Sequence, residues 1–160
     1  MYIDAGRAGG RYEGVLCDVI RAFKYDGRRS LAPPLASMMR DAGKDLLATC
    51  DFAVPVPLHP WRRLRRGFNQ ARDLAERLGC PVVDALWRVR ATSPQMTLRA
   101  RARHTNIRGA FMVAPHKAVD GAVVVVVDDV RTTGATLDEC ARVLRGAGAT
   151  EVRALTAAAA

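Results

Sequence analysis

Residues 122–137 read AVVVVVDDVRTTGATL, and this stretch decides the fold of the chain. An unbroken run of β-branched residues is typical of a strand that is buried on both faces, as in a parallel sheet. Asp128 and Asp129 follow the valines, where the strand is expected to end. In open α/β sheets, ligands bind beyond the carboxyl ends of the strands, so this pair of acids marks a candidate site.

The residues after the acids predict a phosphate-binding loop that opens a helix. Residues 132–136 are small and rich in hydroxyl groups, and apolar residues at helical spacing follow them: Leu137, Cys140, Ala141 and Leu144. Glycines at 146 and 148 are typical helix stop signals. Unpaired backbone N–H groups at a helix start bind anions, and threonine hydroxyls add donors. A buried strand, a capped loop and a packing helix without any ligand would also give this pattern.

Carboxylates repel phosphate, so Asp128 and Asp129 need a different partner. Ribose hydroxyls and divalent metal ions are the chemically suitable ones. Taken as a whole, the segment resembles the 5-phosphoribosyl-1-pyrophosphate (PRPP) motif of type I phosphoribosyltransferases, in which a hydrophobic strand, two acids and a Thr/Gly loop follow one another. The resemblance implies a PRPP site on an α/β fold.

Composition places the chain among single-domain proteins with anionic partners. It has 160 residues, of which 49% are hydrophobic, and a formal net charge of +9. Phosphates, nucleotides and nucleic acid are therefore favoured partners. The 4 cysteines are scattered and form no metal-binding or disulfide pattern. No apolar run approaches a membrane span and no signal peptide is evident, so we expect a soluble, cytoplasmic protein with free thiols.

The N-terminal half predicts two helices and one strand. Residues 1–13 contain glycines and lack an apolar period, so we expect a flexible tail, followed by a single domain over residues 14–160. Apolar residues at helical spacing predict helices over residues 14–27 and 31–39. Residues 52–57 are typical of a short strand, and their prolines favour its end or a sheet edge.

Arginines surround aromatic residues in the segment that follows this strand. Residues 62–70 read RRLRRGFNQ, and Asn69 is suited to cap a helix that extends to Leu78. Three interpretations of the arginines stay open. They bind a pyrophosphate, they bind single-stranded nucleic acid together with the aromatic residues, or they form a solvated basic surface.

A long basic segment precedes the central strand. No acidic residue occurs between Asp84 and Asp120, and residues 91–108 lack a convincing period. A long polar loop inside a compact domain is usually functional or disordered. Strands are predicted within residues 81–90, around Val82, Val83, Leu86 and Trp87, then at 111–113 and finally at 150–156. The alternation of strands and helices predicts an α/β fold with a mainly parallel sheet.

Short motifs occur in an order that resembles the ComF family of phosphoribosyltransferase-like proteins, which is linked in many bacteria to DNA uptake during natural transformation. They are FKYxG at 23–27, VPVPLH at 54–59, RGFNQA at 66–71, TxPQ at 92–95 and the PRPP motif. The resemblance implies a type I phosphoribosyltransferase-like fold: a mainly parallel twisted sheet flanked by helices, with a small N-terminal helical hood. The family typically carries an N-terminal four-cysteine zinc ribbon that these residues do not match, so zinc is not predicted.

The same resemblance implies a role for each part of the site. Asp128 and Asp129 would be catalytic residues that hold the ribose 2′- and 3′-hydroxyls and bind Mg²⁺, in part through water. The 5′-phosphate would be bound by Arg131, Thr132, Thr133, Gly134, Ala135 and Thr136. Pyrophosphate would be bound by Pro57, Leu58, His59 and Arg62. Residues 93–108 would be a mobile catalytic loop that carries Arg99, Arg101 and Arg103.

The resemblance thus implies a phosphoribosyltransferase that uses Mg²⁺ and PRPP, or binds a nucleoside monophosphate. It would transfer the phosphoribosyl group to a nitrogen acceptor and release pyrophosphate. Purine-salvage members often carry an acid where this chain has Thr132, so no general base is expected from this loop. The alternatives are a DNA-uptake accessory protein that keeps the site for sensing or structure and binds single-stranded DNA, and an unrelated basic nucleic-acid binder. The DNA-uptake machinery is a further expected partner, and a homodimer stays open.

Overall fold

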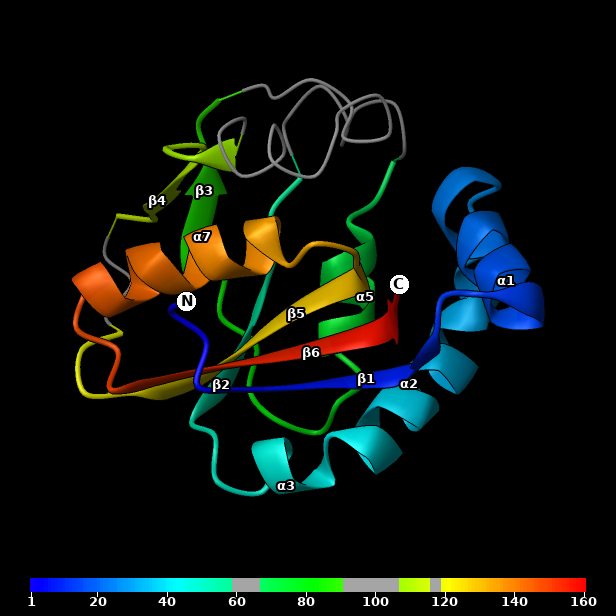
Figure 1. Cartoon of the computed structure of the whole chain (residues 1–160), viewed down its shortest axis with the longest axis horizontal. Helices are drawn as coiled ribbons and strands as arrows, with labels where there is room; N and C mark the ends of the chain where they lie inside the picture. Colours follow the sequence, from blue (N-terminus) through cyan, green and yellow to red (C-terminus); the bar gives the residue numbers. More distant parts are fainter. Residues whose placement is uncertain (59–66, 91–106, 116–118) are drawn as a thin grey trace.

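The computed structural model of the chain describes residues 1–58, 67–90, 107–115 and 119–160. Figure 1 shows helices on both sides of a central sheet. The strands are β1 (Ala5–Arg11), β2 (Phe52–Pro55), β3 (Leu86–Arg88), β4 (Phe111–Val113), β5 (Val123–Arg131) and β6 (Glu151–Ala159). The helices are α1 (Gly14–Tyr25), η1 (Arg29–Leu31), α2 (Ala32–Ala42), α3 (Lys44–Leu47), α5 (Gln70–Ala75) and α7 (Ala135–Gly146).

Four parallel strands form the main sheet in the order β1-β6-β5-β2. The short strands β3 and β4 pair antiparallel to each other in a second sheet. The prediction of an α/β fold with a mainly parallel sheet is therefore confirmed. The predicted helices of the N-terminal hood are α1 and α2, which lie one after the other at one end of the sheet (Figure 1).

Strand β5 is buried on both faces, as its valines predict. Val124 to Val127 are fully buried, and they alternate between two hydrophobic clusters. Val124 and Val126 pack in the cluster that contains apolar residues of α7. Val125 and Val127 pack in the cluster that contains apolar residues of α1, α2 and α5. The two clusters lie on opposite sides of the sheet because side chains alternate along a strand.

The prediction of a flexible tail over residues 1–13 is wrong. Ala5–Arg11 forms strand β1, which pairs in parallel with β6 from Ala5↔Arg153 to Arg11↔Ala159. The glycines that suggested a loose segment have a packing role. A Cβ atom on Gly9 would lie 2.8 Å from the Ala157 carbonyl oxygen and 3.3 Å from Met38 Cβ, so only glycine lets α2 lie this close to β1.

Other boundaries shift by a few residues. Strand β5 continues through the acids to Arg131, and β6 extends to Ala159, because each strand gains main-chain hydrogen bonds from its neighbour. The strand predicted within residues 81–90 is shorter than expected: it is β3 at Leu86–Arg88, and Val82 makes only an isolated parallel bridge to Ala53. In the part of the chain that the structure describes, no helix is long and apolar enough to cross a membrane.

The core predicts a large loss of stability for Leu155→Ala. Leu155 is fully buried in the central strand β6, and a Cβ atom added to Gly43 would lie 2.7 Å from its Cδ1 atom, so it is tightly packed. We expect the free energy of unfolding to fall by about 2–5 kcal/mol. Urea titration measures this value. Val15→Ala, at a side chain that is 78% exposed, is the control and should change it by less than about 0.5 kcal/mol.

Candidate functional site

The predicted phosphate loop connects the carboxyl end of β5 to the start of α7. Arg131 is the last residue of β5, and Ala135 begins the helix. Gly134 has a φ angle of +77°, and an added Cβ would meet only Arg131 Cδ, at 4.0 Å. The Thr133 hydroxyl accepts a hydrogen bond of 3.4 Å from the Ala135 N–H. The loop backbone is therefore open to a ligand at Gly134, where a side chain would otherwise project.

The structure brings Arg131 and Thr132–Thr136 together at the end of β5 that carries the acids. Arg131 and Thr132 are exposed, Ala135 is buried, and Thr133, Gly134 and Thr136 are half-buried. Helix α7 has 12 residues, so its aligned peptide dipoles favour an anion at this end. This arrangement suits a phosphate group, as the sequence pattern predicts.

The two carboxylates leave β5 on opposite faces of the sheet. Asp129 follows the alternation of Val125 and Val127, and Lys24 Nζ of α1 lies 2.9 Å from its Oδ1 and 2.8 Å from its Oδ2. The Asp129 side chain is 8% exposed and that of Lys24 is 22% exposed. Burial alone would lower the pKa of Lys24, but the carboxylates of Asp129 and Asp128 outweigh it and raise the pKa. This ion pair joins the hood to the central strand.

Asp128 faces α7 and has an unusual pKa. Burial, and next the negative charge of Asp129, raise the pKa of Asp128 to about 7, although Lys24 and the Asp129 N–H act against this shift. Burial also raises the pKa of the Cys140 thiol on α7, and the charge of Asp128 contributes to it. Thr156, the register neighbour of Asp128, has a buried hydroxyl without a hydrogen-bond partner in the described ranges. Asp128 is therefore protonated more readily than an ordinary aspartate.

The acid pair could supply two of the ligands of a divalent cation, with water or substrate oxygens as the others. Within the described residues, no group of three or more His, Cys, Asp or Glu side chains could hold a metal ion. Mg²⁺ is commonly bound by one or two carboxylates together with substrate oxygens and water. Burial and, next, the charge of Asp129 raise the pKa of Asp128, and a cation beside the two acids would act against both effects. The donor set thus fits a Mg²⁺ ion that arrives with a hydroxyl-rich anionic ligand.

A cavity of about 650 Å³ lies where β2 ends. Pro57 and Leu58, two of the predicted pyrophosphate residues, line it, whereas His59 and Arg62 lie outside the described residues. The other described residues that line it are Arg29, Pro55, Gly67, Phe68, Asn69, Arg72, Asp73, Glu76, Asp84, Leu86, Trp87, Arg88 and Val89. Arg29 donates to Asp73 at 2.8 and 3.0 Å, and Arg72 pairs with Glu76 and Asp84, so much of the lining charge is paired.

Asn69 fixes the end of β2. Its side-chain Nδ2 donates to the Val56 carbonyl oxygen at 3.1 Å, and its Oδ1 accepts from the Ala71 N–H at 3.1 Å. The predicted N-cap is confirmed, but its second role was not predicted. The neighbouring Gln70 Nε2 donates to the Lys24 carbonyl oxygen at 3.3 Å. Two adjacent residues therefore hold the β2 end and the C-terminal part of α1.

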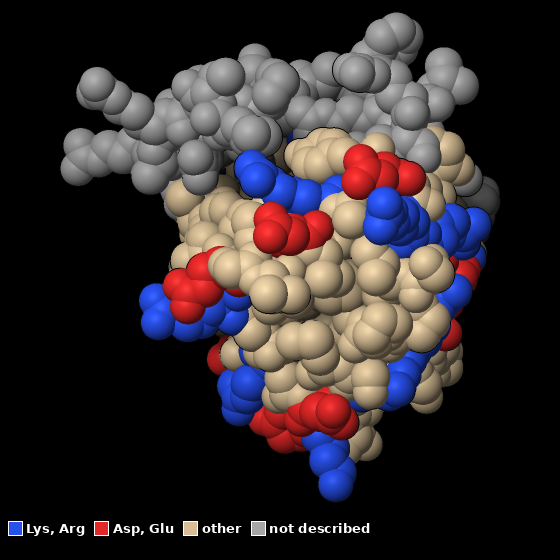
Figure 2. Space-filling view, turned by 90° about the vertical axis from the view of Figure 1, so that its right-hand side faces the viewer, with Lys and Arg blue, Asp and Glu red and all other residues tan. Residues whose placement is uncertain are grey.

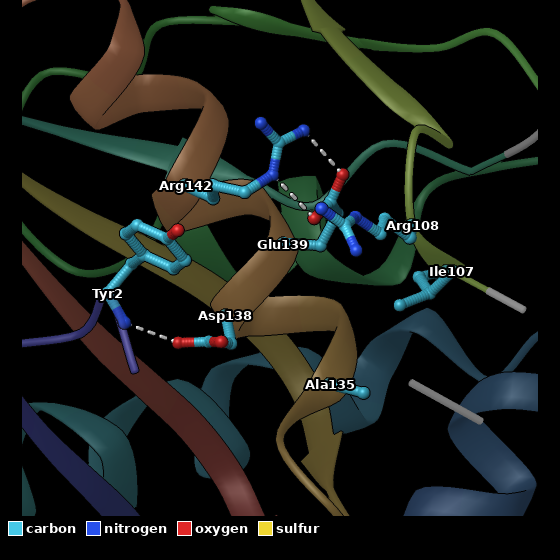
Figure 3. Close-up of a pocket in the computed structure, with 7 residues that line it drawn as sticks. All are labelled: Tyr2, Ile107, Arg108, Ala135, Asp138, Glu139 and Arg142. Atoms are coloured by element: carbon cyan, nitrogen blue, oxygen red, sulfur yellow. Dashed lines mark hydrogen bonds and ion pairs between the residues drawn. The ribbon is translucent and has the colours of Figure 1, made fainter. Parts of the chain in front are cut away.

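The predicted mobile loop, residues 93–108, lies in the chain between the antiparallel strands β3 and β4. Arg99, Arg101 and Arg103 lie outside the described residues. At the β4 end, the Gly109 N–H donates to Glu139 Oε1 of α7 at 2.7 Å, and Arg142 binds both oxygens of Glu139 at 2.8 Å. Figure 3 shows this pair beside Arg108, in a hollow of about 290 Å³ on α7. Helix α7, which follows the phosphate loop, therefore holds the segment that leads into β4.

Figure 2 views the side of the molecule at which β5 and β6 end, and shows basic and acidic side chains next to one another around a wide uncharged surface. The excess positive charge of the sequence is therefore not gathered into one patch among the described residues of this face. Three described residues of the site, Lys24, Gln70 and Glu139, were not predicted from the sequence. The FKYxG motif indicated the segment that carries Lys24, but not its contact with Asp129.

Comparison with known proteins gives a consistent result. Residues 64–160 match the family described as phosphoribosyl transferase domain. The chain is 36% identical to Competence protein F of Haemophilus influenzae, with 90% of this chain and 68% of that protein covered. It is 37% identical to the DNA utilization protein YhgH of Salmonella typhi, with 89% and 66% covered. The chain thus spans about two thirds of the length of these relatives.

A solved structure shares the fold. It is described as the allosteric regulatory enzyme of purine biosynthesis, and it aligns with a TM-score of 0.52 and 22% identity over 86% of this chain and 30% of that chain. At this identity, the likeness supports the arrangement of strands and helices alone.

The raised pKa of Asp128 predicts a pH-dependent effect of Asp128→Asn on stability. The folded-state pKa of about 7 exceeds the ordinary value of about 3.9, so the native state loses stability as the pH rises between these values. Asparagine removes this penalty. We expect the free energy of unfolding of the variant to exceed that of the wild type by about 1–4 kcal/mol at pH 8 and to match it closely at pH 4. Urea unfolding at both pH values measures the difference, and an equal difference at both would contradict the assignment.

Proposed function

Since this chain belongs to the phosphoribosyl transferase domain family, and within it to the group of Competence protein F, we propose that it binds PRPP with Mg²⁺ and transfers the 5-phosphoribosyl group to a nitrogen acceptor. The observation that carries the proposal is the joint placement of an open, glycine-containing loop and two carboxylates at the end of one strand. A ligand that carries a phosphate for the loop and two neighbouring hydroxyl groups for the carboxylates, a few bonds apart, matches these two features.

In this proposal the carboxyl end of β5 binds the 5′-phosphate and the ribose of PRPP, and the end of β2 binds its pyrophosphate. The backbone of residues 132–136 binds the 5′-phosphate, with Gly134 permitting close approach. Asp128 and Asp129 accept hydrogen bonds from the ribose hydroxyls and orient the ring. The β2 end, which Asn69 holds in place, faces the pyrophosphate. Mg²⁺, when bound, would neutralise charge on the pyrophosphate and so assist its departure.

The reaction breaks the bond between C1 of the ribose and the pyrophosphate oxygen, and forms a bond between C1 and the acceptor nitrogen. The pyrophosphate leaves with the electron pair of the broken bond. The acceptor nitrogen supplies the electron pair of the new bond and loses its proton to solvent water. Thr132 occupies the position at which purine-salvage members often carry a carboxylate that could act as a general base. We therefore propose that the acceptor needs no general base from this loop.

Two measurements test this function. Isothermal titration calorimetry should detect PRPP binding that is strengthened by Mg²⁺. Pyrophosphate release should then appear when PRPP is incubated with the protein and one member of a panel of nucleobases and amines. Binding without release for any acceptor would support a sensing role, and absence of PRPP binding would contradict the proposal.

Gly134→Val should abolish PRPP binding. A valine side chain would project into the open loop, and a β-branched residue is strained at a φ of +77°. We expect at least about a hundredfold loss of affinity in calorimetry, since close contact with the phosphate would be lost. Gly121→Val is the matched control, because Gly121 also has a positive φ, of 72°, and open space, but lies at the other end of β5. Undiminished binding by Gly134→Val would rule out this loop as the phosphate site.

A role in DNA uptake is the second candidate, and the names of the relatives support it. In this case the protein would act in the cytoplasm, keep its PRPP site for sensing or structure, and bind single-stranded DNA. Trp87 is 53% exposed beside Arg88 and is suited to stacking on a base. Binding of an oligonucleotide that falls steeply as salt rises, and that Trp87→Ala weakens, would support this role.

A further inference from the structure

Lys24 forms an ion pair with the carboxylate of Asp129, which the proposed function assigns to ligand binding. Its ammonium group lies within 2.9 Å of both oxygens of Asp129. The two residues are 105 positions apart and come from different layers, α1 and β5. An ion pair of this kind brings a costly desolvation of both charges, so its presence next to a candidate ligand site needs an explanation.

The backbone around Lys24 is held in place independently of the ion pair. Gln70 donates to the Lys24 carbonyl oxygen, and the adjacent Phe23 is fully buried against Phe68, with ring centroids 5.6 Å apart. These contacts hold α1 in place in addition to the ion pair. The side chain of Lys24 can leave Asp129 while the helix stays in place.

A divalent cation and the ammonium group would compete for Asp129. Mg²⁺ binds carboxylate oxygens at about 2.1 Å, and Lys24 already contacts both oxygens at hydrogen-bond distance. Two positive charges this close would also repel each other strongly in a buried site. Binding of one cation at Asp129 should therefore weaken binding of the other.

We propose that Lys24 is a displaceable counter-cation of Asp129: it occupies the carboxylate while the site is empty, and a divalent cation that arrives with the ligand displaces it. The inference rests on the proposed function for the identity of the ligand, but the competition itself involves only this chain and the metal ion. Lys24 acts through Asp129 and is thus a positioning residue. Its release leaves a positive charge on α1 close to an anionic ligand, so it opposes metal binding alone and favours the metal together with PRPP.

Titration of Mg²⁺ alone at pH 8 tests the competition. Lys24→Met keeps the apolar stem but removes the charge, and we expect it to bind Mg²⁺ about tenfold or more tightly than the wild type. Lys44→Met removes a lysine of α3 that is exposed, and serves as the control for the change in net charge. The gain must disappear in the double variant Lys24→Met/Asp129→Asn. Unchanged or weaker Mg²⁺ binding by folded Lys24→Met would overturn the proposal.

A measurement on the wild-type protein avoids any doubt about folding of the variants. Acetic anhydride should modify Lys24 slowly in the empty site, and saturating Mg²⁺ should speed this modification several-fold, whereas Lys44 should react at one rate throughout. Peptide mass spectrometry follows both residues. Equal rates at Lys24 with and without bound Mg²⁺ would overturn the displacement.

The two proposals fail separately in these experiments. Lack of PRPP binding by the wild type, with the Mg²⁺ gain in Lys24→Met intact, would reject the proposed function and keep the competition. PRPP binding that requires Mg²⁺, with no gain in Lys24→Met and no change in Lys24 reactivity, would reject the competition alone. PRPP with Mg²⁺ should bind Lys24→Met more weakly than wild type, since the released charge is missing.

Discussion

Burial of β5 on both faces is the constraint on which the rest of the structure depends. The strand has β2 and β6 at its edges, α7 on one face and the N-terminal helices with α5 on the other. Polar groups can therefore reach a ligand only at its ends. The acids and the threonine loop lie at the carboxyl end, where the surrounding helices and strands also converge. The position of the site thus follows from the layers of the fold.

Most of the central fold could be predicted from the sequence because its signals are local. The valine run, the helical spacing after Gly134 and the paired hood helices each depend on neighbouring residues. Strand β1 could not be predicted, because it is formed by main-chain pairing with β6. Its glycine at position 9 is needed because Met38 lies too close for a side chain. The candidate site was found in outline, since its loop and acids are contiguous. Lys24 and Glu139 were missed, because their partners are 105 and 30 residues away.

Electrostatics in the site is asymmetric although its two acids are chemically the same. Asp129 pairs with the ammonium group of Lys24 in a largely buried environment. Asp128 faces α7, where burial and the charge of Asp129 raise its pKa. The difference arises from strand geometry, which turns adjacent side chains to opposite faces. Two acids placed one turn apart on a helix would share a single environment. A strand end is therefore an efficient way to give neighbouring acids separate properties.

The pairing of β1 with β6 also affects how the chain is made. Asp4 and Val152 form hydrogen bonds across 148 residues, and the edge of the sheet is complete only when both are present. During synthesis, β1 stays unpaired until β6 has left the ribosome. Contacts of such high sequence separation slow folding. The glycine-rich, weakly apolar character of β1 is then an advantage, since it gives the waiting segment little tendency to aggregate.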